Sequence, residues 1–597
     1  MLHVLYGSAT GTGQDVAEQI GRMAAARNIR SIVSSMDTFD IQELPTLNYV
    51  VFVASSTGDG EAPENMSACW KFLLRKSLPA DSLQFMQMAV FGLGDSSYAK
   101  YNAVARRLQA RLLQLGATEL IERGLGDDQH ELGYHGTLNP WLDKLWAALL
   151  CLPPFVLPAG FVIDDTPQPT TPKYTVHVAA HEAAMATTTP ASTTTTSSFY
   201  TPPKSALSDT LITATVVAND RLTAADWTQD VRHIELDIAH TGVTYSPGDI
   251  ALLYPENINM ADLDALLSLL QLPPTAVLSI ARIDGAHDIP SPCSASDLVR
   301  KYLDVFGTPR RSFFERLSLF AHDPEEKEKL LELCSPQGAD LLHDYCTRER
   351  RTYIEVLQDF RSCHVPLEYL LEMIPRLTPR AYSIASSSKI HPGKVQLAVA
   401  IVDYKTPYKR EKKGVCSAWL ETLQPGVQVP LQLKTGLFRL TPAMHAKPFV
   451  LIGPGTGIAV MRAIVQERQA LVETHADVGP THVYFGCRHQ AKDYIYGAEW
   501  AAHVARGTVT SLHVAFSRDQ PDKIYVQGKL AEEKAAVFAA LAEGYVFVAG
   551  SAKRMPTDVY ETIRAIVASE GKVTLKEAEA FMKSLIRAKR YVVESWS

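Results

Sequence analysis

Short apolar runs alternate with amphipathic stretches at the start of the chain. Residues 2–6, 49–54 and 88–91 have the length and composition of buried parallel strands. A glycine-, serine- and threonine-rich loop follows each run, and the first loop leads into a stretch with Val16 and Ile20 on one helical face. This order predicts a doubly wound α/β domain whose loops gather at the carboxyl edge of the sheet.

The first of these loops has the composition of an anion site. It reads Ser8, Ala9, Thr10, Gly11, Thr12 and Gly13 and precedes a predicted helix. Converging amides, hydroxyl donors and the helix dipole favour a negative group there. The loop lacks the lysine of a GxxxxGK[ST] motif, so a monophosphate fits better than a triphosphate. A plain tight connection remains the alternative.

Later loops of the same domain supply further candidates. A loop around Asp128 is expected to close the site. Tyr98 is suited to stack on a flat ring, although a tyrosine in such a loop is more often simply packed. The candidate residues are Ser56, Thr57, Gly58 and Asp59 in the second loop, and Leu93, Gly94, Asp95, Ser96, Ser97, Tyr98, Ala99, Lys100, Tyr101 and Asn102 in the third.

The middle of the chain changes its pattern twice. Residues 151–205 lack a core pattern and are rich in threonine and proline, which predicts a flexible linker with a root-mean-square span of roughly 40 Å. Strand-like segments then occupy 209–254 and about 380–440, and a mainly helical pattern lies between them at 258–375. We expect a small β-barrel interrupted by a helical insertion.

Two motifs of the predicted barrel suit a dinucleotide. Arg380, Ala381, Tyr382 and Ser383 form a strand-like segment in which residues 380 and 382 share a face. Such a strand would offer Arg380 to a phosphate and Tyr382 to a flat ring. The segment Gly414, Val415, Cys416 and Ser417 resembles a helix N-terminus with free amides for a pyrophosphate. A surface strand carrying an ordinary arginine and tyrosine is the alternative.

The C-terminal third begins with an apolar strand and a glycine-rich loop that contains Thr456. Further on, cations and hydroxyls cluster in the set that a 2′-phosphate requires, where an NAD site would carry an acid. If extended, the segment would project Lys523, Tyr525 and Gln527 from one face. An exposed basic turn is the alternative. The candidates are Ser517, Arg518, Lys523, Ile524, Tyr525, Val526 and Gln527.

Composition narrows the class of protein. The chain has 46% hydrophobic and 21% charged residues, and its net charge of -7 argues against a broad nucleic-acid-binding surface. Its 8 cysteines form no CxxC pair, which argues against a disulfide framework or a zinc site. No apolar run reaches the ~20 residues of a membrane helix, and a strand-like N-terminus leaves no room for a signal peptide. We therefore expect a cytoplasmic protein.

Taken in order, these motifs resemble the diflavin reductase family. The resemblance implies a multidomain fold with a flavodoxin-like doubly wound domain, an antiparallel FAD-binding barrel with a helical insertion, and a nucleotide-binding α/β domain. It implies an NADPH-dependent oxidoreductase with FAD, FMN and NADPH as cofactors. The expected domains are an FMN domain at 1–150, a linker at 151–205, an FAD domain at 206–445 with its insertion at about 258–375, and an NADPH domain at 446–597.

The resemblance adds residues that spacing alone does not single out. Arg350 is expected to contact FAD, with a possible register slip of one in its arginine run, and Asp558 is expected near the nicotinamide cofactor. Ser383 and Glu594 are the candidates that stabilise the hydride-transfer site. Trp596 is expected to cover the FAD ring and to move before nicotinamide stacks.

Several positions depart from the family pattern. Thr57 stands where many relatives carry an aromatic residue, Val460 and Met461 replace a Pro-Phe pair, and Ala549 replaces a cysteine that assists hydride transfer. A thiol at position 549 therefore cannot assist hydride transfer in this chain. The departures at Ala549, Val460 and Met461 also keep open a regulatory or scaffold protein that retained the folds without catalysis.

Within the family, the chain is most similar to the branch that reduces an anamorsin-type iron–sulfur protein in cytosolic cluster assembly. This assignment rests on the sequence of residues 126–133 and on the terminal Trp-Ser pair. Reductases of methionine synthase or of a soluble haem protein are the alternatives. Acidic residues near the FMN loops could steer a basic partner, or could simply be solvated: Asp59, Glu61, Glu64, Asp95, Asp127 and Asp128.

Overall fold

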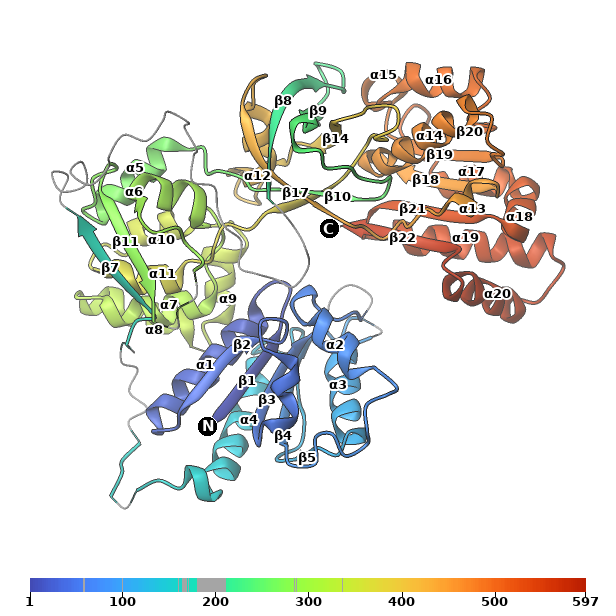
Figure 1. Cartoon of the computed structure of the whole chain (residues 1–597). Helices are drawn as coiled ribbons and strands as arrows, with labels where there is room; N and C mark the ends of the chain where they lie inside the picture. Colours follow the sequence, from blue (N-terminus) through green and yellow to red (C-terminus); the bar gives the residue numbers. More distant parts are fainter. Residues whose placement is uncertain are drawn as a thin grey trace.

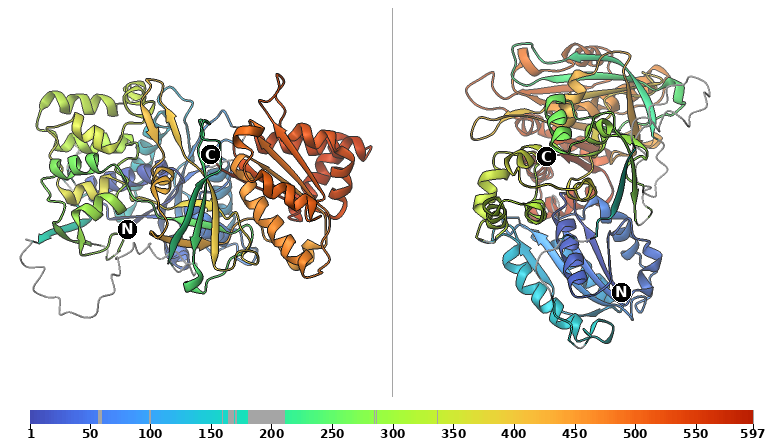
Figure 2. Two further views of the ribbon diagram at one scale, coloured as in Figure 1. Left: turned by 90° about the horizontal axis from the view of Figure 1, so that it is seen from above. Right: turned by 90° about the vertical axis from the view of Figure 1, so that its left-hand side faces the viewer.

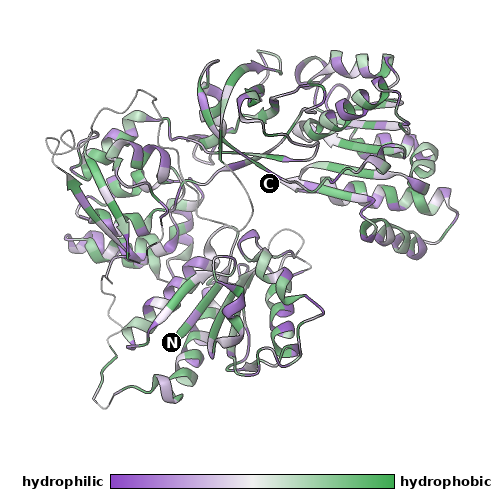
Figure 3. Cartoon of the chain, in the orientation of Figure 1, coloured by the Kyte–Doolittle hydropathy of each residue, from purple (hydrophilic) through white to green (hydrophobic). Residues whose placement is uncertain are grey.

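The computed structural model describes residues 1–56, 60–98, 100–158, 160–163, 169, 171–179, 211–283, 285, 287–335 and 337–596. Figure 1 shows an N-terminal α/β domain, a helical region beside it, a β-barrel and a C-terminal α/β domain. Apolar residues concentrate on the strands and on the helix faces that cover them (Figure 3). In the described residues no helix is long and apolar enough to span a bilayer.

The N-terminal domain is a parallel sheet of order β2-β1-β3-β4-β5, with β6 also paired to β4. Separate apolar cores lie on its two faces, as a doubly wound sheet requires. The strands are β1 (Leu2–Gly7), β2 (Ser31–Ser35), β3 (Tyr49–Ser55), β4 (Gln87–Gly94), β5 (Thr118–Glu119) and β6 (Gly124–Asp127). The helices are α1 (Thr12–Ala26), α2 (Ser67–Leu73), α3 (Ala103–Gln114) and α4 (His135–Leu150).

The barrel is an antiparallel sheet of order β13-β10-β17-β8-β9-β14. A bridge between Ile384 and Leu397 closes β13 onto β14, and helix α12 packs Trp419 and Leu420 into the interior. Its elements are β8 (Ile212–Arg221), β9 (Val231–Asp237), β10 (Ile250–Leu253), β13 (Arg380–Ser383), β14 (Lys394–Ala400), β17 (Gln428–Lys434) and α12 (Val415–Thr422), with a hairpin of β15 (Asp403–Lys405) and β16 (Glu411–Lys413).

The insertion between β10 and β13 is mainly helical, as expected, and two of its strands form a sheet of order β12-β11-β7 with a strand that precedes the barrel in the sequence. Its apolar core is a cluster separate from that of the barrel. The helices are α5 (Met260–Leu269), α6 (Ala295–Asp297), α7 (Arg311–Leu317), α8 (Pro324–Cys334), α9 (Ala339–Leu342), α10 (Tyr353–Asp359) and α11 (Leu367–Met373). The strands are β7 (Tyr174–Ala179), β11 (Val277–Arg282) and β12 (Cys293–Ser294).

Strand β7 corrects the expectation of a linker that is irregular throughout 151–205. Residues 174–179 pair antiparallel with β11. Tyr174 is buried, and its hydroxyl lies 2.6 Å from Asp288 Oδ2 and 2.6 Å from Arg376 Nη2. These partners lie more than a hundred positions away, so local composition could not reveal the strand. The threonine-rich stretch at 187–198 lies outside the described residues.

The C-terminal domain is a parallel sheet of order β20-β19-β18-β21-β22. Figure 2 shows it beside the barrel. The strands are β18 (Phe449–Pro454), β19 (Thr481–Cys487), β20 (Ser511–Phe516), β21 (Tyr545–Ser551) and β22 (Tyr591–Trp596). The helices are α13 (Pro442–His445), α14 (Ile458–Glu473), α15 (Gln490–Asp493), α16 (Gly497–Ala505), α17 (Val526–Glu532), α18 (Lys534–Glu543), α19 (Met555–Glu570) and α20 (Leu575–Arg587).

A buried arginine joins this domain to the barrel. Arg462 of α14 donates to the Ala385 carbonyl at 2.6 Å and to Gln396 Oε1 at 2.8 Å, both on the barrel side. Its Nε also lies 2.9 Å from the Glu499 carboxylate, so its charge is compensated. The barrel and the C-terminal sheet are thus connected by specific polar contacts, which fix the position of residues on either side.

Candidate functional site

The loop after β1 presents backbone donors at the start of α1. Ser8 Oγ accepts the amides of Gly11 at 2.9 Å and Gly13 at 3.1 Å, so this hydroxyl folds the loop. Gly11 has φ 88, a conformation that favours glycine. In the described residues the amides of Ala9 and Thr10 have no acceptor. This donor set at a helix N-terminus fits a phosphate.

The other loops lie at the same carboxyl edge. Asp127 of β6 accepts the Ser96 amide at 2.9 Å, and Asp95 accepts the Ser97 amide at 2.8 Å. Tyr98 is 65% exposed, so its ring is available for stacking. Partial burial and then the carboxylates of Asp95 and Asp127 raise the pKa of Asp128. Loop residues Thr57, Gly58, Asp59 and Ala99 lie outside the described residues.

Some predicted loop residues make contacts within the protein. The Tyr101 hydroxyl donates to the Leu125 carbonyl at 2.9 Å, and the Asn102 amide donates to the Gly126 carbonyl at 2.9 Å. Ser56 Oγ accepts the Val104 amide at 3.3 Å. These side chains position the loops. Leu93 is buried on β4, Gly94 ends that strand, and Lys100 is exposed.

The predicted dinucleotide segment forms strand β13. It pairs with β10, with Arg380 opposite Leu253 and Tyr382 opposite Ala251, so residues 380 and 382 share a face and Ala381 and Ser383 share the other. Arg380 Nη1 donates to the Thr378 carbonyl at 2.7 Å, which leaves other guanidinium donors available.

Helix α12 begins beside this strand, with Gly414 as its N-cap and Val415 as its first residue. Ser417 Oγ accepts the Val402 amide at 3.0 Å and fixes the first turn. Cys416 is buried next to Tyr382, and burial followed by the nearby Cys416 raises the pKa of that tyrosine. The structure therefore places the two predicted motifs side by side.

Arg350 lies in an irregular turn and not on a helix face. It is exposed and has φ 50. Its neighbours are occupied: Arg348 pairs with Asp344 at 2.8 Å, and Arg351 pairs with Asp359 at 2.6 Å. In the part of the chain that the structure describes, Arg350 alone of these three has no ion pair. Its assignment to FAD stays a prediction.

The predicted NADPH residues follow β18 and β20. Thr456 lies in a 3₁₀ turn, Gly455–Gly457, directly after β18. Ser517 is buried after β20, and Arg518, Lys523 and Tyr525 are exposed. Because the carboxyl ends of parallel strands share one edge, these residues can face a common ligand. Asp558 lies in the first turn of α19, which follows β21.

One geometric expectation in this segment is wrong. Helix α17 begins at Val526, so Gln527 is helical and does not continue an extended face with residues 523 and 525. Ile524 instead packs against the domain core. Val526 and Leu530 pack into the same core, and this tertiary contact favours the helix over an extended conformation.

The C-terminal strand brings the expected hydride-transfer residues together. In the register of β21 and β22, Ala549 lies opposite Glu594. Ser383 Oγ lies 3.4 Å from Glu594 Oε2, although the residues are 211 positions apart. Burial raises the pKa of Glu594, and the bond from Ser383 opposes that rise. Trp596, two residues on, is 38% exposed.

Three of the residues that depart from the family pattern are core residues. Val460 and Met461 are buried in α14, and Ala549 is buried in β21. A Cβ at Gly457 would overlap the Ala549 carbonyl, so the glycine loop and β21 approach closely. Through packing, these residues support the carboxyl edge of the C-terminal sheet, where the nucleotide is expected to bind.

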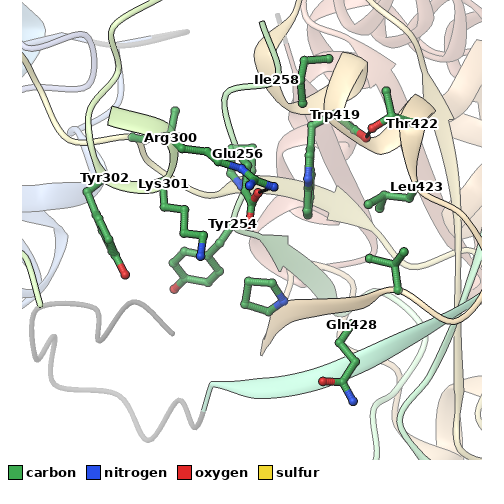
Figure 4. Close-up of a pocket in the computed structure, with 14 residues that line it drawn as sticks. Tyr254, Glu256, Ile258, Arg300, Lys301, Tyr302, Trp419, Thr422, Leu423 and Gln428 are labelled. Atoms are coloured by element: carbon green, nitrogen blue, oxygen red, sulfur yellow. Dashed lines mark hydrogen bonds and ion pairs between the residues drawn. The ribbon is translucent and has the colours of Figure 1, made fainter. Parts of the chain in front are cut away.

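A separate cavity of about 340 Å³ lies between the barrel and the insertion (Figure 4). Tyr254 and Trp419 line it together with Arg300, which pairs with Glu256 at 2.5 Å. Residues Thr422 and Leu423, at the end of α12, also line it. None of the residues predicted from the sequence as site residues borders this cavity.

Comparison with known proteins assigns each part of the chain. Residues 4–141 match the flavodoxin family, 205–419 the FAD-binding domain family and 451–561 the oxidoreductase NAD-binding domain family. The chain is 41% identical over 606 residues to "NADPH-dependent diflavin oxidoreductase 1" of Danio rerio, covering 100% of this chain and 99% of that protein.

More distant relatives carry the same name. The protein of Arabidopsis thaliana is 38% identical and that of Schizosaccharomyces pombe 34% identical, each over 100% of this chain and 99% of the relative. The donor sets above fit the flavins and the nicotinamide nucleotide that these families bind. The predicted fold class, enzyme class and cofactors are therefore confirmed: this chain belongs to the NADPH-dependent diflavin oxidoreductase family, and its cofactors are FAD, FMN and NADPH.

Proposed function

We propose that this enzyme passes electrons from NADPH through FAD and FMN to the iron–sulfur cluster of an anamorsin-type protein in cytosolic cluster assembly. NADPH supplies two electrons as hydride, FAD accepts the pair and FMN releases single electrons to the acceptor. The observation that carries the proposal is that two flavin-binding domains share one chain that matches its relatives over their full length.

The residues of this chain bind and orient the cofactors. The loop at Ser8–Gly13 would hold the FMN phosphate, and the exposed Tyr98 would be available to stack on the flavin ring. Arg380 and the start of α12 would hold the FAD pyrophosphate, and Tyr382 would contact the flavin ring. Arg518 and Lys523 bind the 2′-phosphate that distinguishes NADPH from NADH.

At the hydride-transfer site, the Glu594 carboxyl holds a proton and Ser383 Oγ hydrogen-bonds to this carboxyl. The Glu594 carboxyl is buried, and its raised pKa favours the protonated form. Trp596 would cover the flavin ring when FAD is bound and would have to move before nicotinamide stacks there. Because Ala549 has no thiol, Ser383 and Glu594 carry the polar role at this site.

Acidic residues at the FMN edge support a basic docking surface on the partner. Asp95, Asp127 and Asp128 lie together at the ends of β4 and β6, and Glu61, in the chain segment after β3, is exposed. Glu64 differs, because it pairs with Lys434 of the barrel. An acidic edge of this kind accelerates encounter with a basic partner and loses its effect in high salt.

The test uses purified full-length enzyme, NADPH and an anamorsin-type protein without oxygen. We expect rapid bleaching of the oxidised cluster spectrum, with a rate that falls as ionic strength rises. Parallel reactions contain a methionine synthase or a soluble haem protein. Faster reduction of either alternative acceptor than of the iron–sulfur protein would contradict the proposed acceptor.

The proposed cytosolic location is supported by the cysteines. All eight are free thiols, seven of them buried. Free thiols persist in a reducing compartment. Fractionation of cells followed by detection of the intact chain tests the location directly.

A further inference from the structure

Arg310 of the insertion lies on the FMN loop of the N-terminal domain. Its Nη2 donates to the Thr10 carbonyl, and its Nη1 lies 3.3 Å from Asp15 Oδ1. A Cβ added to Gly11 would overlap the guanidinium, so the arginine also occupies the space beside that residue. The contacts span about three hundred positions of sequence and join two separate domains.

The arginine is firmly attached to the insertion. It is the N-cap of α7, and its carbonyl accepts the Phe313 amide at 3.0 Å. Phe313 and Phe314, in the first turn of α7, are buried in the insertion core. The position of the guanidinium therefore depends on where the insertion lies relative to the FMN loop.

The contact is suited to hold the loop in its ligand-binding form. A carbonyl that accepts from Arg310 faces the insertion, while the amides of Ala9 and Thr10 remain without protein acceptors among the described residues. Asp15 would otherwise place an acid within the first turn of α1, close to a bound phosphate. Pairing with Arg310 offsets that negative charge.

We propose that Arg310, which belongs to the insertion, is a positioning residue for the FMN phosphate loop of the N-terminal domain. FMN affinity and docking of the insertion onto the N-terminal domain are therefore linked. The inference rests on the FMN site proposed above. Because linkage is reciprocal, bound FMN strengthens docking of the insertion onto the N-terminal domain by the same factor by which docking strengthens FMN binding.

The first test measures the FMN dissociation constant of full-length variants by the recovery of flavin fluorescence. We expect Arg310→Gln to weaken FMN binding by about tenfold, as loss of a charge-assisted contact predicts, without loss of FAD. Arg310→Lys keeps the charge and should recover part of the affinity. High salt should lower the FMN affinity of the wild-type protein toward that of Arg310→Gln.

The matched control is Arg22→Gln. Arg22 pairs with Glu315 of α7 at 3.9 Å, across the same interface but away from the loop. This partly exposed pair contributes little to docking, so we expect Arg22→Gln to lower FMN affinity far less than Arg310→Gln does. Equal affinity in Arg310→Gln and wild type, or an equal loss in both variants, would overturn the inference.

The second test measures hydrogen exchange of residues 310–317 when FMN is added to FMN-depleted enzyme. We expect FMN to slow exchange there in the wild type and not in Arg310→Gln. Unchanged exchange in the wild type would overturn the linkage. If the wild type itself failed to bind FMN, the proposed function would fail; if it bound FMN and both tests were negative, only the role of Arg310 would fail.

Discussion

The Ser383 hydroxyl donates to the Glu594 carboxylate across the junction of the barrel and the C-terminal sheet, with 3.4 Å between Oγ and Oε2. The two residues come from β13 and β22, and neither domain alone contains the pair. Ala549 lies beside Glu594 in the neighbouring strand. The site therefore depends on the packing of both domains.

Replacing Glu594 by glutamine should slow hydride transfer and stabilise the fold at neutral pH. A positioned proton-transfer group contributes roughly 100-fold or more to rate, so we expect a loss of that order. Stopped-flow absorbance of FAD after mixing with NADPH measures it. Ser383→Ala should show a smaller loss in the same assay, and an unchanged rate in Glu594→Gln would exclude the role.

The stability of the same variant has a defined pH dependence. Burial raises the folded-state pKa of Glu594 above its ordinary value of 4.5. Its contribution to stability is therefore complete below pH 4.5 and is lost as pH rises through the folded-state value. Glu594→Gln should melt about 2 °C higher than wild type at neutral pH, with no difference near pH 4. A lower melting temperature at neutral pH would contradict this account.

Truncating Trp596 should change cofactor choice more than stability. Its side chain is 38% exposed, so Trp596→Ala removes little core packing. Nicotinamide would reach the flavin without displacing a ring, and we expect kcat/KM with NADH to rise at least about tenfold relative to NADPH. Steady-state kinetics with both nucleotides and the rate of FAD reduction measure the effect. No change in either quantity would remove the gating role.

Arg518 should determine recognition of the 2′-phosphate. Arg518→Ala removes an exposed cation, and we expect KM for NADPH to rise about tenfold while KM for NADH changes little. Lys534→Ala is the control, because Lys534 pairs with Glu570 at 2.9 Å on α18, away from the nucleotide edge. An equal rise for both nucleotides would indicate a structural defect.

His135 should make docking of the FMN domain sensitive to acid. Burial, followed by the Arg311 cation across the interface, lowers the pKa of His135 from 6.5 to about 3. The contribution of neutral His135 to docking is fully present above pH 6.5 and is lost as the pH falls toward 3. The other charged or titratable groups around the small cavity between α1, α4 and α7 are Asp15, Arg22, Tyr134, Arg311 and Glu315.

Small-angle X-ray scattering measures this docking. We expect the wild-type chain to expand between pH 7.5 and 5.5, and His135→Gln, which stays uncharged, to expand less. Identical pH dependence in both proteins would exclude His135 as the cause.

The sequence by itself determined the domain classes, because they depend on local order: apolar strand, glycine-rich loop, amphipathic helix. The loop at Ser8–Gly13 and the segment at Arg380–Ser383 were recognisable for the same reason, since their donors lie within a few consecutive positions. Strand β7 and the helical start of α17 were not recognisable, because each is stabilised by partners from distant segments.

Only the tertiary structure decided which distant side chains meet. Arg310 has no local motif, yet packing of the insertion against α1 brings it to Thr10 and Asp15. Ser383 and Glu594 were individually predicted, but their hydrogen bond required β22 to lie at the barrel. Such contacts arise from the burial of apolar faces between domains, a property of the folded chain that no short window of sequence contains.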